Sequence, residues 1–90
     1  MISYKAAHRF SSGNRNLVVM SDNCGCFHCL AIFKPTSIFA WTDGKEWEPH
    51  ATALCPKCGI DSVLPSEAGF PITKEFLKAM ENHWFAHYSA

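Results

Sequence analysis

Apolar residues near the end of the chain recur at the spacing of a helix. They fall on one helical face and are Phe76, Leu77, Met80, Trp84, Phe85 and Tyr88. Thr73 is a suitable N-cap, because its hydroxyl can accept a hydrogen bond from the first helical turn. Ile72 and Leu77 have the spacing of a hydrophobic staple across that cap. The pattern predicts an amphipathic helix over residues 73–87.

The first twenty residues carry a weaker and interrupted helical pattern. Tyr4, Ala7 and Phe10 give a loose apolar face, and the polar segment 11–14 breaks it. An apolar run, 17–20, follows the break. We expect a short helix, an interruption, and then either a second helical turn or an extended piece, because adjacent valines also suit a strand.

The middle of the chain alternates short apolar runs with turn-forming residues. The runs 30–33 and 52–54 predict two short strands. Pro35 can open a single helical turn, and Asp43-Gly44 is a strong turn signal. Loops are expected at residues 46–50 and 65–71.

Four of the five cysteines form two Cys-x-x-Cys pairs, Cys26/Cys29 and Cys55/Cys58. Two intervening residues let one tight turn point both sulfurs at the same ion, and two such turns supply the four ligands of tetrahedral Zn²⁺. The sequence contains no recognisable signal peptide or membrane segment, so we expect a cytoplasmic location. Thiols stay reduced there, and paired cysteines then indicate metal binding rather than disulfides. The pairs therefore predict one structural zinc site.

The first half of this site has competing ligands. The segment 24–29, Cys-Gly-Cys-Phe-His-Cys, offers Cys24 and His28 beside Cys26 and Cys29. The Cys26/Cys29 pair fits a metal-binding turn best, which leaves Cys24 as a free thiol, a neighbour of the site or an alternative ligand. His28 lies inside the loop and is expected to point away from the metal. The other histidines are expected at the surface or at helix ends, and they are His8, His50, His83 and His87.

Charge and composition narrow the function classes. Eight basic residues balance eight acidic ones, which disfavours nucleic-acid binding driven by phosphate contacts. A nucleic-acid-binding zinc ribbon is therefore the alternative, with a local patch drawn from Lys5, Arg9, Arg15 and Lys57. Four cysteines leave no open metal position, so no catalytic residue is assigned, and a nuclease-like or thiol-based enzyme is the third hypothesis.

Aromatic residues are abundant for so short a chain, with seven Phe, three Trp and two Tyr. Trp41 and Trp84 lie in apolar patterns and are expected in the core. Trp47 stands between two glutamates shortly before a proline, so we expect its ring to be exposed and to contact a partner. The favoured hypothesis is a protein-interaction module, with another protein as its partner.

The cysteine motifs and their surroundings are similar to those of a known family. Segments 24–30 (CGCFHCL), 33–35 (FKP), 52–64 (TALCPKCGIDSVL) and 72–77 (ITKEFL) resemble small bacterial cytoplasmic proteins of uncharacterised activity that carry a zinc-ribbon-like motif. The likeness extends from about Ala6 to Phe85. It implies a bacterial or phage source and supports metal binding by the two pairs. It also implies that Cys24, in the recurring Cys-Gly-Cys stretch, is more than a spare thiol.

Together these patterns predict one domain, 1–90, of a small α+β zinc-binding class. Zinc-ribbon-like or treble-clef-like knuckles would lie at the ends of a short β-hairpin or sheet. N-terminal helical segments and the C-terminal helix would pack against that sheet. The metal would contribute to the free energy of folding, because so small a sheet buries little apolar surface.

Overall fold

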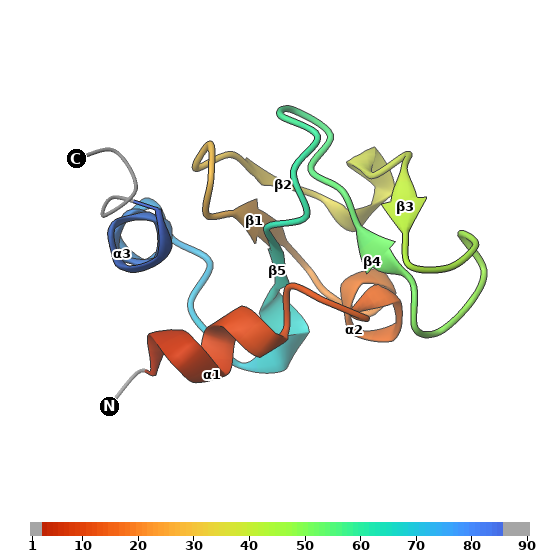
Figure 1. Ribbon diagram of the computed structural model, residues 1–90, viewed down its shortest axis with the longest axis horizontal. Coiled ribbons are helices and arrows are strands. Elements are labelled where there is room, and N and C mark those ends of the chain that lie inside the picture. Colours follow the sequence, from red (N-terminus) through yellow and green to blue (C-terminus); the bar gives the residue numbers. More distant parts are fainter. Residues whose placement is uncertain (1–2, 86–90) are drawn as a thin grey trace.

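The structure is a computed structural model, and it describes residues 3–85. Short strands form two small sheets, and short helices pack around them (Figure 1). The helices are α1 (Tyr4–Arg9), α2 (Arg15–Val19), the 3₁₀ turns η1 (Pro35–Ser37) and η2 (Ser66–Ala68), and α3 (Lys74–Trp84). The strands are β1 (Cys24–Cys26), β2 (Ile32–Phe33), β3 (Trp41–Thr42), β4 (Thr52–Ala53) and β5 (Val63–Pro65). This confirms the predicted α+β class.

Strand β1 is the centre of a three-stranded antiparallel sheet with the order β2-β1-β5. Cys24 lies opposite Phe33 of β2, and Cys26 lies opposite Val63 of β5. Strands β3 and β4 form a separate antiparallel pair. Each strand has only two or three residues, so the sheets rely on what packs against them.

The three-stranded sheet divides the interior into two apolar clusters, because successive side chains along a strand point to opposite faces. One cluster gathers around the two-stranded sheet and α2, and it comprises Val18, Cys24, Cys26, Phe33, Ile38, Ala53, Cys55 and Val63. The other lies under α3 and comprises Ala7, Phe27, Leu64, Phe76, Leu77 and Met80. Neighbours along β5 show the division, since Val63 belongs to the first cluster and Leu64 to the second.

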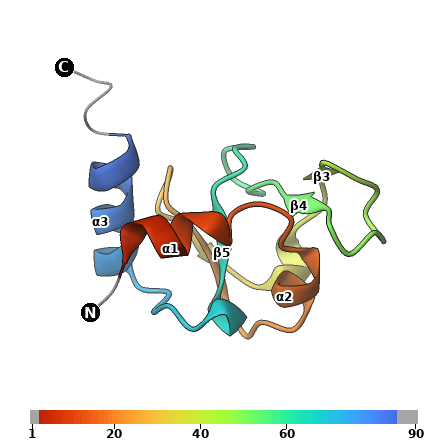
Figure 2. The same ribbon diagram turned by 60° about the horizontal axis from the view of Figure 1, so that its bottom comes forward.

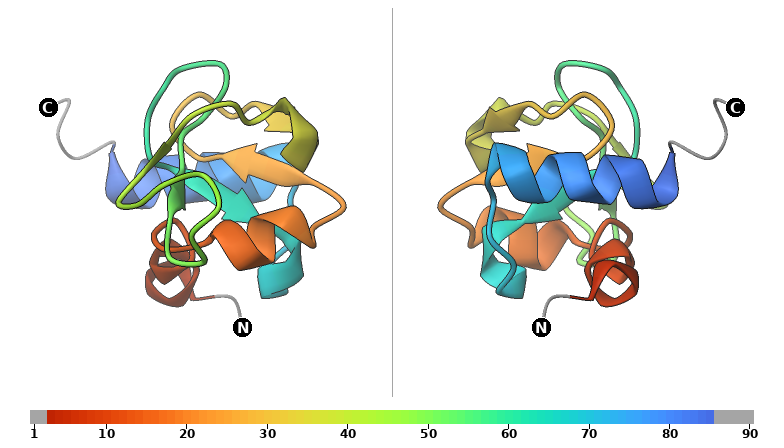
Figure 3. Two further views of the ribbon diagram at one scale, coloured as in Figure 1. Left: turned by 90° about the vertical axis from the view of Figure 1, so that its right-hand side faces the viewer. Right: turned by 90° about the vertical axis from the view of Figure 1, so that its left-hand side faces the viewer.

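Helix α3 lies across one face of the three-stranded sheet (Figure 3, right). Gly25 of β1 makes the close approach possible. A Cβ atom at this position would stand 2.8 Å from Leu77 Cδ1 and 2.9 Å from Ile72 Cγ2. Both residues of the predicted staple therefore rest on this glycine, and any larger residue would push the helix away from the sheet.

The start of α3 is as the sequence predicts. The Thr73 hydroxyl oxygen accepts a hydrogen bond of 3.1 Å from the Phe76 N–H. The helix ends at Trp84, with Phe85 as its C-cap, whereas the apolar pattern predicts an end at residue 87. The last two residues of the predicted helix, Ala86 and His87, lie outside the described part of the chain, as does Tyr88.

In the N-terminal segment, the apolar run that suits both a helical turn and an extended piece is helical in the structure. After α1 the chain turns and continues as α2, and Figure 2 shows α1 running between α3 and α2. The buried side chain of Asn14, between the two helices, holds this arrangement. Its amide nitrogen donates to Phe10 O at 2.8 Å and Val63 O at 3.0 Å, and its oxygen accepts from Ala53 N at 3.1 Å.

The strands β1 and β5 are not anticipated by the sequence analysis, which assigns 24–29 to a metal-binding loop and begins a loop at Pro65. The strands expected at 30–33 and 52–54 are present in shortened form as β2 and β4. Pro35 opens the single turn η1, as predicted. No helix among the described residues has both the length and the apolar character needed to span a membrane.

Candidate metal centre

The antiparallel pairing of β1 and β5 brings the two Cys-x-x-Cys segments together. The first segment begins at the end of β1 and turns back into β2. The second lies between β4 and β5 and ends just before β5 begins. Because the strands run in opposite directions, the end of β1 and the start of β5 are neighbours, and the Phe27 N–H donates to Ser62 O at 3.1 Å. Both cysteine pairs therefore lie at one end of the sheet.

Both segments form the same metal-binding turn, which we call a knuckle: residues 26–31 and 55–60. In the first, Cys26 N donates to Ala31 O at 2.9 Å and Leu30 N donates to Cys26 O at 2.9 Å. In the second, Cys55 N donates to Ile60 O at 3.0 Å, and the N–H of the glycine after the second cysteine donates to Cys55 O at 2.9 Å. The two loops thus share one backbone pattern although their sequences differ.

The residue after the second cysteine of each knuckle adopts a left-handed backbone. Gly59 has φ +79° and Leu30 has φ +66°. Glycine takes this conformation freely, whereas a leucine is strained in it. The left-handed end of the second knuckle is therefore predictable from its Cys-Gly ending, whereas no residue type signals the left-handed end of the first, which is predictable only from its Cys-x-x-Cys spacing. The Leu30 carbonyl accepts a hydrogen bond of 2.9 Å from Lys74 Nζ at the start of α3.

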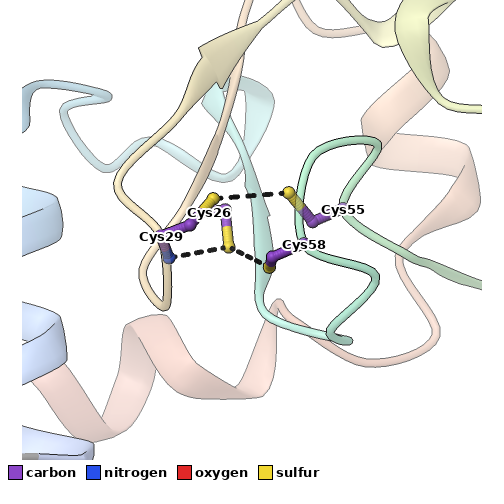
Figure 4. A group of neighbouring side chains, drawn as sticks. All are labelled: Cys26, Cys29, Cys55 and Cys58. Atoms are coloured by element: carbon purple, nitrogen blue, oxygen red, sulfur yellow. Dashed lines mark hydrogen bonds between the residues drawn. The ribbon is translucent and has the colours of Figure 1, made fainter.

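The four predicted ligands converge on one point (Figure 4). All four sulfur atoms lie within 4.8 Å of one another. The Sγ atoms of Cys26 and Cys58 are 3.7 Å apart, and so are those of Cys29 and Cys55. A metal bound to four sulfurs at about 2.3 Å requires tetrahedral edges of about 3.8 Å between them. Two of the sulfur–sulfur distances already match such an edge and the others are no longer than 4.8 Å, so the four cysteines could hold a metal ion.

Hydrogen bonds to sulfur are distributed unequally over the four ligands. Cys26 Sγ accepts from His28 N at 3.3 Å and Cys29 N at 3.4 Å, and it contacts the Ser62 hydroxyl at 3.0 Å. Cys55 Sγ accepts from Lys57 N at 3.3 Å. Such bonds disperse the negative charge that thiolates bring to a metal site. Sequence analysis does not identify Ser62, because its role follows only from the position of β5 against the first knuckle.

Burial and hydrogen bonding shift the pKa values of the thiols in different directions. Burial raises the pKa of Cys26 far above its usual value, against the lowering effect of its contact with Ser62. Burial also raises the pKa of Cys58. At Cys55 burial acts in the same direction, but backbone N–H groups of Cys58 and Lys57 outweigh it and lower the pKa. Four thiolates in this space would repel one another, so their joint ionisation requires a cation at their centre.

Cys24 and His28, the competing ligands of the first knuckle, lie outside this cluster. The Cys24 side chain is fully buried in the apolar cluster with Val18 and Phe33, and burial raises the pKa of its thiol to about 12. Cys24 is thus placed as a core residue. His28 is exposed, and its ring meets the Phe85 ring edge-on with centroids 5.1 Å apart.

The other histidines and the tryptophans lie mainly where the sequence suggests. His8, His50 and His83 are exposed, and none of them approaches the four sulfurs. Trp41 packs against the first apolar cluster and Trp84 against the second.

Trp47 is 65% exposed in the loop between β3 and β4, so its predicted exposure is confirmed. Phe39, at 75%, is a second exposed ring that the sequence analysis does not single out.

Comparison of the chain with protein-family models, curated proteins and solved structures finds no significant match. The resemblance to the small bacterial family, and the bacterial or phage source that it implies, therefore stay predictions. The predicted zinc-ribbon-like class also stays a prediction, because no solved structure matches. In this chain the second knuckle connects strands of two different sheets.

Proposed function

We propose that Cys26, Cys29, Cys55 and Cys58 bind one Zn²⁺, and that this zinc stabilises a small module that contacts another protein. The observation that supports the metal is the convergence of the four sulfurs, which lie within 4.8 Å of one another, with two pairs at the 3.7 Å expected for an edge of a tetrahedral four-thiolate site. Tetrahedral sulfur sites select zinc or iron among the common metals. Zinc is proposed because it needs no redox role and suits a site that holds a fold together.

The proposed role of the zinc is structural. Four protein ligands complete a tetrahedral shell and leave no position for water or substrate. Cys26 and Cys55 are also members of an apolar cluster, so the metal would join the β1 end of the sheet to the β4 side of the core. Without the metal, no bond would link the sulfurs of the two knuckles.

The proposed interaction surface is the loop that carries Trp47. This loop is ordered by hydrogen bonds at both ends, since the Lys45 N–H donates to Glu48 Oε1 at 2.7 Å and Ala51 N donates to Glu48 O at 3.0 Å. The Arg15 side chain donates to Glu46 O from α2. An exposed tryptophan on a loop that is already fixed loses little conformational freedom on binding, which favours its use as an anchor.

Elemental analysis of the purified chain tests the metal. We expect one zinc per chain in the wild type and in Cys24→Ala, the matched control, because Cys24 lies outside the sulfur cluster. Cys55→Ser and Cys58→Ser should lose the metal and the cooperative unfolding transition. If iron is found in place of zinc, the four-cysteine site stands but its metal is iron. A folded chain purified without any metal would refute the site.

Affinity capture with the wild type and Trp47→Ala tests the interaction. A protein partner held by Trp47 should be captured by the wild type and lost by the variant, while zinc content stays at one per chain. Trp41→Phe, a conservative change at a packed tryptophan, is the control and should capture the same protein. Binding to DNA or heparin that weakens steeply with salt would instead favour the nucleic-acid alternative.

A further inference from the structure

The four sulfurs of the metal centre differ in how well the fold protects them. Cys26 and Cys55 are 0% and 2% exposed, and Cys58 is half-buried and packs against the same apolar cluster. Cys29 is exposed and belongs to neither apolar cluster. The residue at one corner of the site is therefore exposed to solvent.

Within residues 3–85, no N–H hydrogen bond is found to the Cys29 sulfur, in contrast to Cys26 and Cys55, whose sulfurs accept such bonds. Among the described residues, the polar contact found for Cys29 Sγ is with another sulfur, that of Cys55, at 3.7 Å. The Cys29 backbone N–H is directed instead to Cys26 Sγ. Hydrogen bonds and burial both reduce the reactivity of a thiolate, and susceptibility to oxidation follows thiolate character and exposure. Cys29 is thus the ligand least shielded from an attacking molecule.

We propose that Cys29 is an oxidation site for hydrogen peroxide or another small hydroperoxide, and that its oxidation releases the zinc through a disulfide with Cys55. The inference rests on the proposed zinc site and adds a specific point of attack. The partner in the disulfide follows from geometry, because the sulfur contacting Cys29 belongs to the opposite knuckle rather than to its own.

The chemistry uses two thiolates and one peroxide molecule. The Cys29 thiolate attacks one peroxide oxygen, the O–O bond breaks, hydroxide leaves, and the sulfur becomes a sulfenic acid. The Cys55 thiolate then attacks the Cys29 sulfur, the S–O bond breaks, and a second hydroxide leaves as the disulfide forms. The two sulfurs together lose two electrons, which the peroxide accepts. Only Cys26 and Cys58 remain as thiolate ligands, too few to retain the metal.

The experiment titrates the zinc-loaded chain with substoichiometric hydrogen peroxide. Zinc release is followed with a chromogenic chelator, free thiols are then blocked with a maleimide, and peptides are mapped without reduction. We expect one zinc released per disulfide, and the first disulfide to join Cys29 to Cys55. A first disulfide within a knuckle, Cys26–Cys29 or Cys55–Cys58, or a first sulfenic acid at Cys58 would overturn the proposal.

Matched ligand replacements give an independent measurement. Imidazole can replace one thiolate in a structural zinc site, so Cys29→His and Cys58→His should both retain metal. Without the exposed sulfur, Cys29→His should release zinc at least about tenfold more slowly under peroxide, whereas Cys58→His should react at about the wild-type rate. Equal rates for the two variants would refute the role of Cys29. If a variant fails to bind zinc, the wild-type peptide map decides alone.

Zinc content measured before peroxide separates this inference from the proposal on which it rests. A folded chain purified without any metal refutes the metal site itself. A chain that contains one zinc but is oxidised first at another cysteine refutes only the assignment of Cys29.

Discussion

Replacing Asn14 by alanine removes a side chain whose hydrogen bonds join the strand entering the second knuckle to the strand leaving it. Ala53, in β4, lies two residues before Cys55, and Val63 opens β5 after that knuckle. The Asn14 amide bonds to the backbone of both. Its third bond, to Phe10 O, fixes the turn between α1 and α2.

The cost of this substitution comes from buried backbone groups that lose their partners. Asn14 is 2% exposed, and Ala53 is 0% exposed, so water does not replace the lost amide. Each buried polar group left unpaired costs about 1–3 kcal/mol, so the Ala53 N–H and the Val63 carbonyl together cost about 2–6 kcal/mol; we take about 3 kcal/mol, in the lower half of that range. The Asn14 side chain makes no capping bond to α2, so helix capping adds nothing to this figure.

Urea unfolding at a fixed free zinc concentration measures the effect. We expect Asn14→Ala to lower the free energy of unfolding by about 3 kcal/mol. Because folding and metal binding are coupled in small zinc domains, the same loss should appear as about 150-fold weaker apparent zinc affinity. Asn16→Ala, at an exposed position of α2, is the control and should change stability by less than about 0.5 kcal/mol. Equal effects at the two positions would refute the bridging role of Asn14.

Three further substitutions test other parts of the structure, each by thermal unfolding of the zinc-loaded chain. Gly25→Ala should destabilise by about 1–3 kcal/mol, because its methyl group overlaps Leu77; a neutral result would contradict the close packing of α3 on β1. Gly59→Ala should cost about 1–2 kcal/mol from its left-handed backbone alone, since no atom lies within 4 Å of the added Cβ. Gly59→Asn should lower the stability less than Gly59→Ala, and equal losses for the two variants would count against the left-handed backbone as the cause. Thr73→Ala should cost about 1 kcal/mol through the lost cap, with Thr36→Ala, exposed in η1, as a neutral control.

Helix α3 was predictable because its signals are local. The cap at Thr73 and the staple from Ile72 to Leu77 lie within six residues, and the apolar stripe gives the period directly. Strands β1 and β5 gave no comparable signal. Each has three residues with little alternation, and β1 contains a glycine whose purpose is clear only when α3 lies against it. Their pairing depends on contacts between residues about forty apart in sequence, which no local pattern contains.

The metal centre was predictable in its ligands but not in its surroundings. Cys-x-x-Cys spacing encodes a turn, so two such pairs identified the four converging sulfurs. The same spacing could not exclude Cys24 from the first knuckle. That exclusion comes from β1, because Cys24 is part of a strand whose side chains enter the apolar cluster. The Ser62 contact with Cys26 likewise depends on the register of β5 and was not predictable from the sequence.

The position of the metal centre explains why its four ligands are unequal. Each knuckle begins where a strand ends, β1 for the first and β4 for the second, so the ligands nearest the strands, Cys26 and Cys55, continue the apolar cluster and share its burial. The second cysteine of each knuckle lies farther along its turn. Cys58 is half-buried and still packs against the core, whereas Cys29 is exposed and belongs to neither apolar cluster. A zinc at this place would therefore both complete the core on one side and expose a reactive sulfur on the other, so the contact that stabilises the fold is also the point at which oxidation can break it.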